Sequence, residues 1–90
     1  MSCYELIIKG RVQGVSYRYF AWKAALQLGI KGYVKNLYNG DVLIVAKASE
    51  QDINGFMEKL KIGPSMAIVK AVIKTEIESC ENYRDFKIIY

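Results

Sequence analysis

The sequence predicts an α+β fold in which two helices cover one face of a mostly antiparallel sheet. Segments with strand-like alternation or helical apolar spacing follow one another in the order β-α-β-β-α-β, and a further strand follows at the C-terminal end. Each helical segment carries one core-facing apolar stripe, and a single sheet face can bury both stripes. A length of 90 residues corresponds to one domain, residues 1–90, because domains usually span roughly 100–200 residues.

The first two elements are a strand and a helix. Alternating apolar side chains predict a strand from Cys3 to Lys9. Two glycines then bracket a short loop, after which apolar residues recur at helical spacing between Tyr17 and Leu28. Gly29 follows in the position of a helix-ending glycine, so we expect the helix to stop at Leu28.

A hairpin follows this helix. The segments Ile30 to Leu37 and Asp41 to Ala48 predict two strands. Asn39-Gly40 stands between them, and both of these residues tolerate the positive φ that a type I′ turn demands. The sequence therefore predicts a hairpin with a two-residue type I′ turn.

The second half of the chain continues with a helix and two strands. Ser49, with Asp52 three residues later, is a candidate cap for a helix that ends before Gly63-Pro64. From Met66 to Glu78 polar and apolar residues alternate, which predicts a half-exposed strand with one apolar face. That face is expected to consist of Ala67, Val69, Ala71, Ile73 and Ile77. A polar turn leads to the last strand, residues 84–90.

The first six of these elements have the order of the split-βαβ, ferredoxin-like βαββαβ sandwich. Proteins of this fold include RNA binders, metal chaperones, regulatory domains and enzymes. The fold class therefore leaves the function open.

The composition excludes several kinds of chemistry. There are no histidines, so the usual neutral-pH general base and the commonest zinc ligand are both missing. Cys3 and Cys80 form no CxxC pair, and we expect two reduced thiols and no metal site, although a disulfide between them stays open. The longest uncharged apolar stretch, Val42 to Ala46, is far below the ~20 residues of a membrane span, so we expect a cytoplasmic protein.

The net charge of +4 is unevenly distributed. Between Leu6 and Gly40 there are six basic residues and no acidic one, whereas the part from Lys47 onward carries seven of each sign. A localised positive field favours an anionic partner, such as nucleic acid, an anionic membrane or a small phosphate-bearing molecule. An ordinary solvated surface is the alternative.

The loop before the first helix is a candidate anion site. Main-chain N–H groups at a helix N-terminus are unpaired and attract anions, and Gly14 permits close approach to the backbone. Arg18 lies one turn in and can bind a phosphate through two parallel N–H donors. In a right-handed βαβ unit, Asn36 of the next strand can lie near this loop. An exposed arginine and an asparagine that bonds its own turn are the alternatives.

Two segments of the sequence resemble the signature motifs of the acylphosphatase family. The first is Gly10-x-Val12-Gln13-Gly14-Val15-x-Tyr17-Arg18, and the second is Gly32-Tyr33-Val34-Lys35-Asn36-x-x-x-Gly40-x-Val42. Both motifs occur in the correct order and spacing, and Gly63-Pro64 and the final aromatic strand also resemble the family. The sequence departs from the residues typical of the family it resembles at three positions: Tyr17 replaces a common Phe, Ser16 a frequent Gly, and Ala48 the Gly at the end of the third strand.

The resemblance implies an enzyme that hydrolyses acyl phosphates to carboxylate and inorganic phosphate. It implies that Arg18 and Asn36 are the catalytic residues and that no cofactor or metal is needed. The phosphate-binding residues that it implies are Gln13, Gly14, Val15, Ser16, Tyr17 and Arg18.

The alternative is a non-catalytic module of the same fold that binds phosphate or RNA. RNA recognition on such sheets uses exposed aromatics on the central strands, and the first strand offers only Ile7 between Glu5 and Lys9 on its polar parity. We therefore do not expect a nucleic-acid partner, and the short apolar stretches give no reason to expect a membrane partner. A monomer is expected, with a weak dimer through Tyr19, Trp22 and Leu26 as the alternative.

Overall fold

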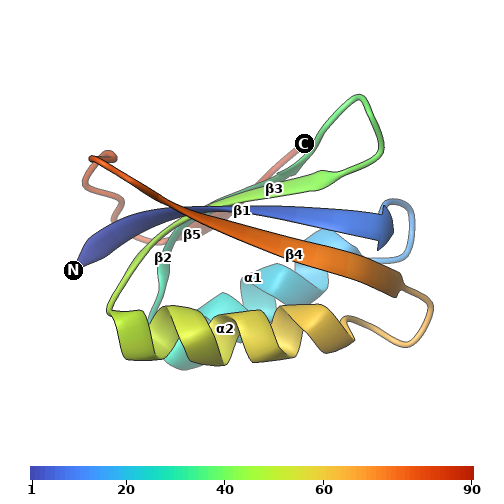
Figure 1. Ribbon diagram of the computed structural model, residues 1–90, viewed down its shortest axis with the longest axis horizontal. Helices are drawn as coiled ribbons and strands as arrows, with labels where there is room; N and C mark the ends of the chain where they lie inside the picture. The colour runs from blue at the N-terminus through green and yellow to red at the C-terminus, as the bar shows by residue number, and fades with distance from the viewer.

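The computed structural model describes residues 1–90 and has two layers, a five-stranded sheet and two helices that both pack on one of its faces (Figure 1). The predicted α+β, ferredoxin-like fold class is confirmed. The elements are β1 (Ser2–Arg11), α1 (Tyr17–Leu28), β2 (Lys31–Asn36), β3 (Val42–Ala48), α2 (Glu50–Ile62), β4 (Ile68–Ile77) and β5 (Phe86–Ile89).

The strand order β4-β1-β3-β2-β5 brings three strand ends to one edge of the sheet. Strand β3 pairs antiparallel with both β1 and β2, so β1 and β2 run in the same direction. Strand β5 pairs parallel with β2 and ends at the same edge. Ile8 of β1 and Asn36 of β2 are register partners of the same residue, Val42. The loop after β1, the end of β2 and the C-terminus therefore lie together.

The core lies between the sheet and the helices. Its largest fully buried side chains come from every layer: Tyr17 of α1, Phe56 and Leu60 of α2, and Leu6 and Ile44 of the sheet. None of the residues buried in the core is charged. Ser49 caps α2 as predicted, because its hydroxyl accepts a hydrogen bond from the Asp52 N–H at 3.1 Å. Neither helix is long and apolar enough to cross a membrane.

The turn between β2 and β3 differs from the predicted type I′ turn. Asn39 does not have a positive φ, and only Gly40 does, at 96°. The hairpin is closed by the Leu37 N–H, which donates to the Asp41 carbonyl at 2.9 Å, so the loop has three residues. The Asn39 side chain accepts a bond from the Asp41 N–H at 3.0 Å. This local bond satisfies the turn without the left-handed conformation at Asn39.

Strand β4 does not have the single apolar face that its alternation predicts. The register with β1 shifts at Lys9 and Gly10, which pair with Ala71 and Val69 and leave Lys70 as an extra residue. This bulge reverses the parity of the strand. As a result Val72 packs against the core, whereas Ile73 is 46% exposed.

The expectation of two reduced thiols is wrong. Cys3 at the start of β1 and Cys80 in the segment before β5 form a disulfide, with their Cα atoms 5.9 Å apart. The sequence separation of 77 residues carries no local signal for this contact. The pairing depends on the path of the 78–85 segment, which crosses the end of the sheet from β4 to β5 (Figure 1).

Candidate active site

The loop between β1 and α1 exposes a row of main-chain donors. Gly14 has a φ of 73°, and Ser16 has a φ of 62°, the only positive value at a residue other than glycine. Ser16 is the N-cap of α1, yet its side chain makes no capping hydrogen bond. None of the N–H groups of residues 13–19 donates to a backbone or side-chain acceptor in the chain. These donors lie at the positive end of a helix, an arrangement that can bind an anion, and we call this row of N–H groups the cradle.

Ser16 adopts the left-handed backbone conformation, in which glycine is the least strained residue. A residue with a Cβ pays roughly 1 kcal/mol or more in this region of the backbone map. The protein accepts this cost at the point where the chain turns into α1. Strain concentrated at an open helix N-terminus is typical of a binding site.

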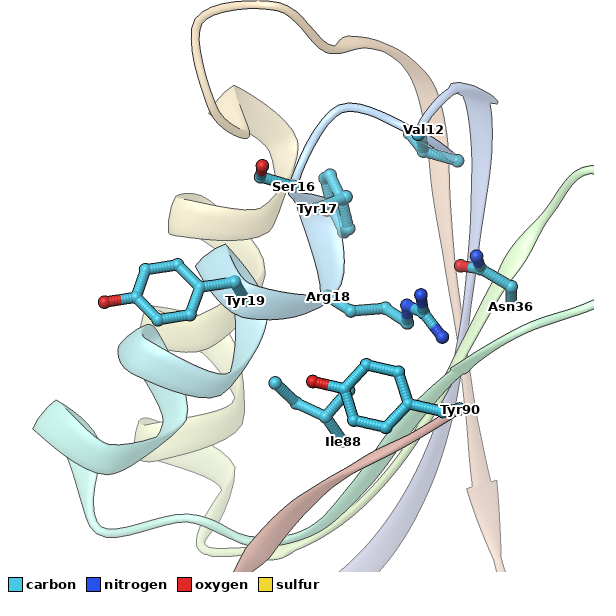
Figure 2. A pocket seen from close by; sticks show the side chains of 9 residues that line it. Val12, Ser16, Tyr17, Arg18, Tyr19, Asn36, Ile88 and Tyr90 are labelled. Carbon is cyan, nitrogen blue, oxygen red and sulfur yellow. The ribbon is translucent and has the colours of Figure 1, made fainter.

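Arg18 projects from the first turn of α1 toward the same edge of the sheet (Figure 2). Its Nη1 donates to the carbonyl of Ile89 at 3.0 Å, and its guanidinium carbon lies 4.9 Å from the centre of the Tyr90 ring. No carboxylate forms an ion pair with it. The C-terminal end of the chain therefore orients the guanidinium without neutralising it, and the remaining donors are available to a ligand.

Asn36 ends β2 and faces the guanidinium of Arg18 across the site (Figure 2). Its Oδ1 atom is buried and has no hydrogen-bond donor, and it is the only buried side-chain polar atom without a partner. A buried acceptor without a donor costs about 1–3 kcal/mol. Such an atom at the edge of a cavity indicates a place for a donor that arrives with the ligand.

A cavity of about 160 Å³ joins these parts. Since one water occupies about 30 Å³ of liquid volume, it has room for a phosphate group and part of what the phosphate carries. Its lining residues are Val12, Gly14, Ser16, Tyr17, Arg18, Tyr19, Asn36, Ile88 and Tyr90. The structure thus brings Arg18 and Asn36 into one pocket, together with part of the loop.

Two of the residues expected in the phosphate cradle do not line the cavity with their side chains. The Gln13 amide donates instead to the carbonyls of Leu37 and Asp41, at 2.7 and 2.8 Å. Val15 packs against the hydrophobic core. Only the main chain of these two residues remains as a candidate for contact with an anion.

Tyr17 has a structural role inside the core. Its hydroxyl donates to the Leu60 carbonyl at 2.7 Å and so ties α1 to the last turn of α2. Burial raises the pKa of this hydroxyl well above its ordinary value. Tyr17 is only 1% exposed, so it anchors the start of α1, directly after the loop, in the core. Its hydroxyl does not titrate near neutral pH.

Sequence reasoning missed the contribution of the C-terminus. Ile88 and Tyr90 line the cavity, and the Ile89 carbonyl holds Arg18. The alternation of the last strand predicted its presence but not its parallel pairing with β2, which brings its end to Arg18. No residue signal in the sequence carries this information.

The arrangement can bind a dianion and orient a neutral molecule, but no carboxylate, thiol or imidazole side chain lines it. No Asp, Glu or Cys lines the cavity, and the sequence has no histidine. Nowhere do three His, Cys, Asp or Glu side chains gather into a potential metal site. A fixed cation, unpaired N–H groups and one amide oxygen remain, which is a set suited to electrostatic stabilisation.

Comparisons with known proteins agree with this picture. The family model for acylphosphatase matches residues 4–88. An acylphosphatase of Archaeoglobus fulgidus is 43% identical over 90 residues, covering 100% of both chains. One of Vibrio parahaemolyticus is 42% identical over 89 residues, covering 99% of this chain and 98% of its own. The crystal structure of the Bacillus subtilis acylphosphatase superposes with a TM-score of 0.95 at 38% identity, covering 100% of both chains.

Proposed function

Because this chain belongs to the acylphosphatase family, we propose that Arg18, Asn36 and the main chain from Gln13 to Arg18 carry the family's reaction. The protein is an enzyme that hydrolyses the carboxyl–phosphate bond of acyl phosphates to carboxylate and inorganic phosphate. The observation that carries the assignment of residues is the shared cavity of Arg18 and Asn36 beside the unpaired N–H groups.

The cradle and the guanidinium bind the phosphate group of the substrate. The N–H groups of residues 13–18, which have no acceptor within the protein, donate to its oxygens, and the free donors of Arg18 add further hydrogen bonds. Phosphoryl transfer passes through a loose transition state with charge spread over three equatorial oxygens. Donors already in place stabilise this charge without reorganising during the reaction.

Asn36 orients the attacking water. The water donates a hydrogen bond to the buried Oδ1 atom, which has no donor within the protein. Its oxygen forms the new bond to phosphorus in line with the acyl oxygen, while the bond to the acyl oxygen breaks and its electron pair leaves with the carboxylate. The proton of the water passes to a phosphate oxygen, since neither an arginine nor an asparagine accepts it.

The leaving group explains why the site needs neither imidazole nor metal. A carboxylate is the conjugate base of an acid with a pKa of about 4, so it departs without protonation. We therefore propose that catalysis is independent of metal ions. Activity that is unchanged in EDTA supports this, and activity lost in EDTA and restored by a divalent ion contradicts it.

The test is hydrolysis of benzoyl phosphate by three variants. We expect Arg18→Gln to lower kcat/KM by about 10³-fold or more and to weaken inhibition by inorganic phosphate. Arg18→Lys should also fail, because an ammonium lacks the two parallel donors. Asn36→Ala should lower kcat by about 10²-fold or more and leave phosphate inhibition nearly intact.

The matched controls are Arg84→Gln and Asn54→Ala. Both side chains are exposed and lie outside the cavity. The controls should retain the activity of the unaltered protein. Full activity of either Arg18→Gln or Asn36→Ala would refute the assignment of the site.

We propose further that the protein acts in the cytoplasm as a monomer. Exposed apolar side chains on α1 are limited to Tyr19 and Leu26, since Trp22 packs partly against the core. Together with the Cys3–Cys80 disulfide, the proposed location requires a cytoplasm in which such bonds persist, as in hyperthermophiles. Cell fractionation and sedimentation from micromolar to millimolar concentration test these points, and a periplasmic location or a dimer would contradict them.

A further inference from the structure

The side chain of Gln13 connects the two halves of the site. Its Nε2 atom lies 2.7 Å from the Leu37 carbonyl oxygen and 2.8 Å from the Asp41 carbonyl oxygen. Because a carbonyl oxygen can only accept, both amide hydrogens are donated and the orientation of the amide is unambiguous. Both hydrogen bonds are partly buried, so they are shielded from competition by water.

The two acceptors close the turn that follows Asn36. The Leu37 N–H donates to the Asp41 carbonyl at 2.9 Å, and the Gly40 N–H donates to the Leu37 carbonyl at 3.2 Å. The amide of Gln13 therefore binds both sides of the hairpin at its base. Leu37 is the residue next to Asn36, so this contact lies one peptide bond from the proposed water-orienting residue.

On the other side of the contact, Gln13 is the first residue of the cradle. The loop from Val12 to Ser16 makes no backbone hydrogen bond through its own N–H groups. It also contains Gly14, whose added Cβ would meet nothing within 4 Å. The loop is thus short of internal restraints at the point where it must present its donors. The hydrogen bonds of the Gln13 amide supply such a restraint, because they fix the position of the loop relative to the strand that carries Asn36.

We propose that Gln13 is a positioning residue that sets the distance between the phosphate cradle and Asn36. This inference rests on the proposed roles of Arg18 and Asn36. An attacking water and a bound phosphate must meet within a few tenths of an ångström, and a displacement of about 1 Å costs on the order of 100-fold in rate. Loss of the Gln13 contact should therefore impair turnover more than phosphate binding.

The decisive variants are Gln13→Met and Gln13→Glu. Methionine keeps the length of the side chain without its donors, and glutamate keeps the shape but sets a carboxylate against two carbonyl oxygens. The control is Lys9→Met, which removes the exposed bond from Lys9 to the Asp41 carboxylate at 2.8 Å and leaves the loop untouched. For each variant kcat and KM on benzoyl phosphate, the inhibition constant of inorganic phosphate and the urea midpoint are measured.

We expect Gln13→Met to lower kcat about 10- to 100-fold and to change the inhibition constant of phosphate by less than about 3-fold. Gln13→Glu should be at least as impaired, and Lys9→Met should keep kcat within about twofold. A structural role alone would lower the urea midpoint of Gln13→Met and leave kcat of the folded protein unchanged. That result, or an equal loss of kcat and phosphate affinity, would overturn the inference.

A double variant separates this inference from the proposed function. If Gln13 acts through Asn36, Gln13→Met should have little further effect on kcat in the Asn36→Ala background. Fully additive losses would show that Gln13 acts elsewhere and would refute its positioning role. If Arg18→Gln and Asn36→Ala are impaired but Gln13→Met is not, only the inference about Gln13 fails. Full activity of Asn36→Ala refutes both.

Discussion

Reduction of the Cys3–Cys80 disulfide should remove a large part of the stability of this protein. The bond closes a loop with a sequence separation of 77 residues. The chain-entropy relation for a loop of this length gives a stabilisation of about 4.5 kcal/mol at 25 °C. Domains of this size are stable by about 5–15 kcal/mol in total. Reduction therefore moves the protein close to the limit of a stable fold.

The assay is urea unfolding of the oxidised protein, the protein in dithiothreitol, and the double variant Cys3→Ala/Cys80→Ser. For a small domain the free energy of unfolding falls by about 1 kcal/mol per molar urea, so the urea midpoint should fall by roughly 4 M on reduction. The double variant should match the reduced protein and should not respond to dithiothreitol. Activity of the folded reduced protein should remain, because β5 has its own ladder to β2 and the Gly32 N–H donates to the Asp85 carbonyl at 3.0 Å.

Two results would refute this reasoning. The first is labelling of two thiols per chain in the unfolded protein before any reductant is added, which would show that the cysteines are not paired. The second is a loss of less than about 1 kcal/mol on reduction. In that case the unfolded chain would be compact enough that the cross-link removes little of its entropy.

The remaining predictions concern Tyr17 and two glycines. Tyr17→Phe removes the donor to the Leu60 carbonyl and should cost about 1–2 kcal/mol by urea unfolding at pH 8. Because burial raises the pKa of Tyr17 in the folded state, the contribution of its hydroxyl to stability is complete below pH about 10 and declines as the pH rises above that value. The cost of Tyr17→Phe should therefore shrink between pH about 10 and 11. An unchanged cost would contradict a buried, protonated hydroxyl at this position. At Gly32, with a φ of 142°, an added Cβ would overlap the Val45 carbonyl oxygen, and Gly32→Ala should cost about 3 kcal/mol or more. Gly55→Ala, on the open surface of α2, is the control and should stabilise by about 0.5–1 kcal/mol; equal effects of both alanines would refute the steric argument.

The order and type of the elements could be predicted because their signals are local. Gly29 ends α1 in the left-handed conformation, with a φ of 69°, and Ser49 caps α2. Both depend on residues within one helical turn of each other. The unpaired N–H groups of the loop before α1 are also a local feature, since they are a property of any helix N-terminus. Its connection to acyl phosphate chemistry depended on the resemblance of two motifs to a known family.

The sequence by itself determined the α+β class, the placement of the elements and the residue types available for chemistry, because apolar periodicity, caps and composition act over a few residues. The tertiary structure alone decided the Cys3–Cys80 bond and the parity reversal of β4 at Lys70. It also decided the hydrogen bond from Arg18 to the Ile89 carbonyl and the contact of Gln13 with the hairpin. Each of these joins segments far apart in the chain or depends on strand register. Register is decided by how all the strands pack together, which no single segment encodes.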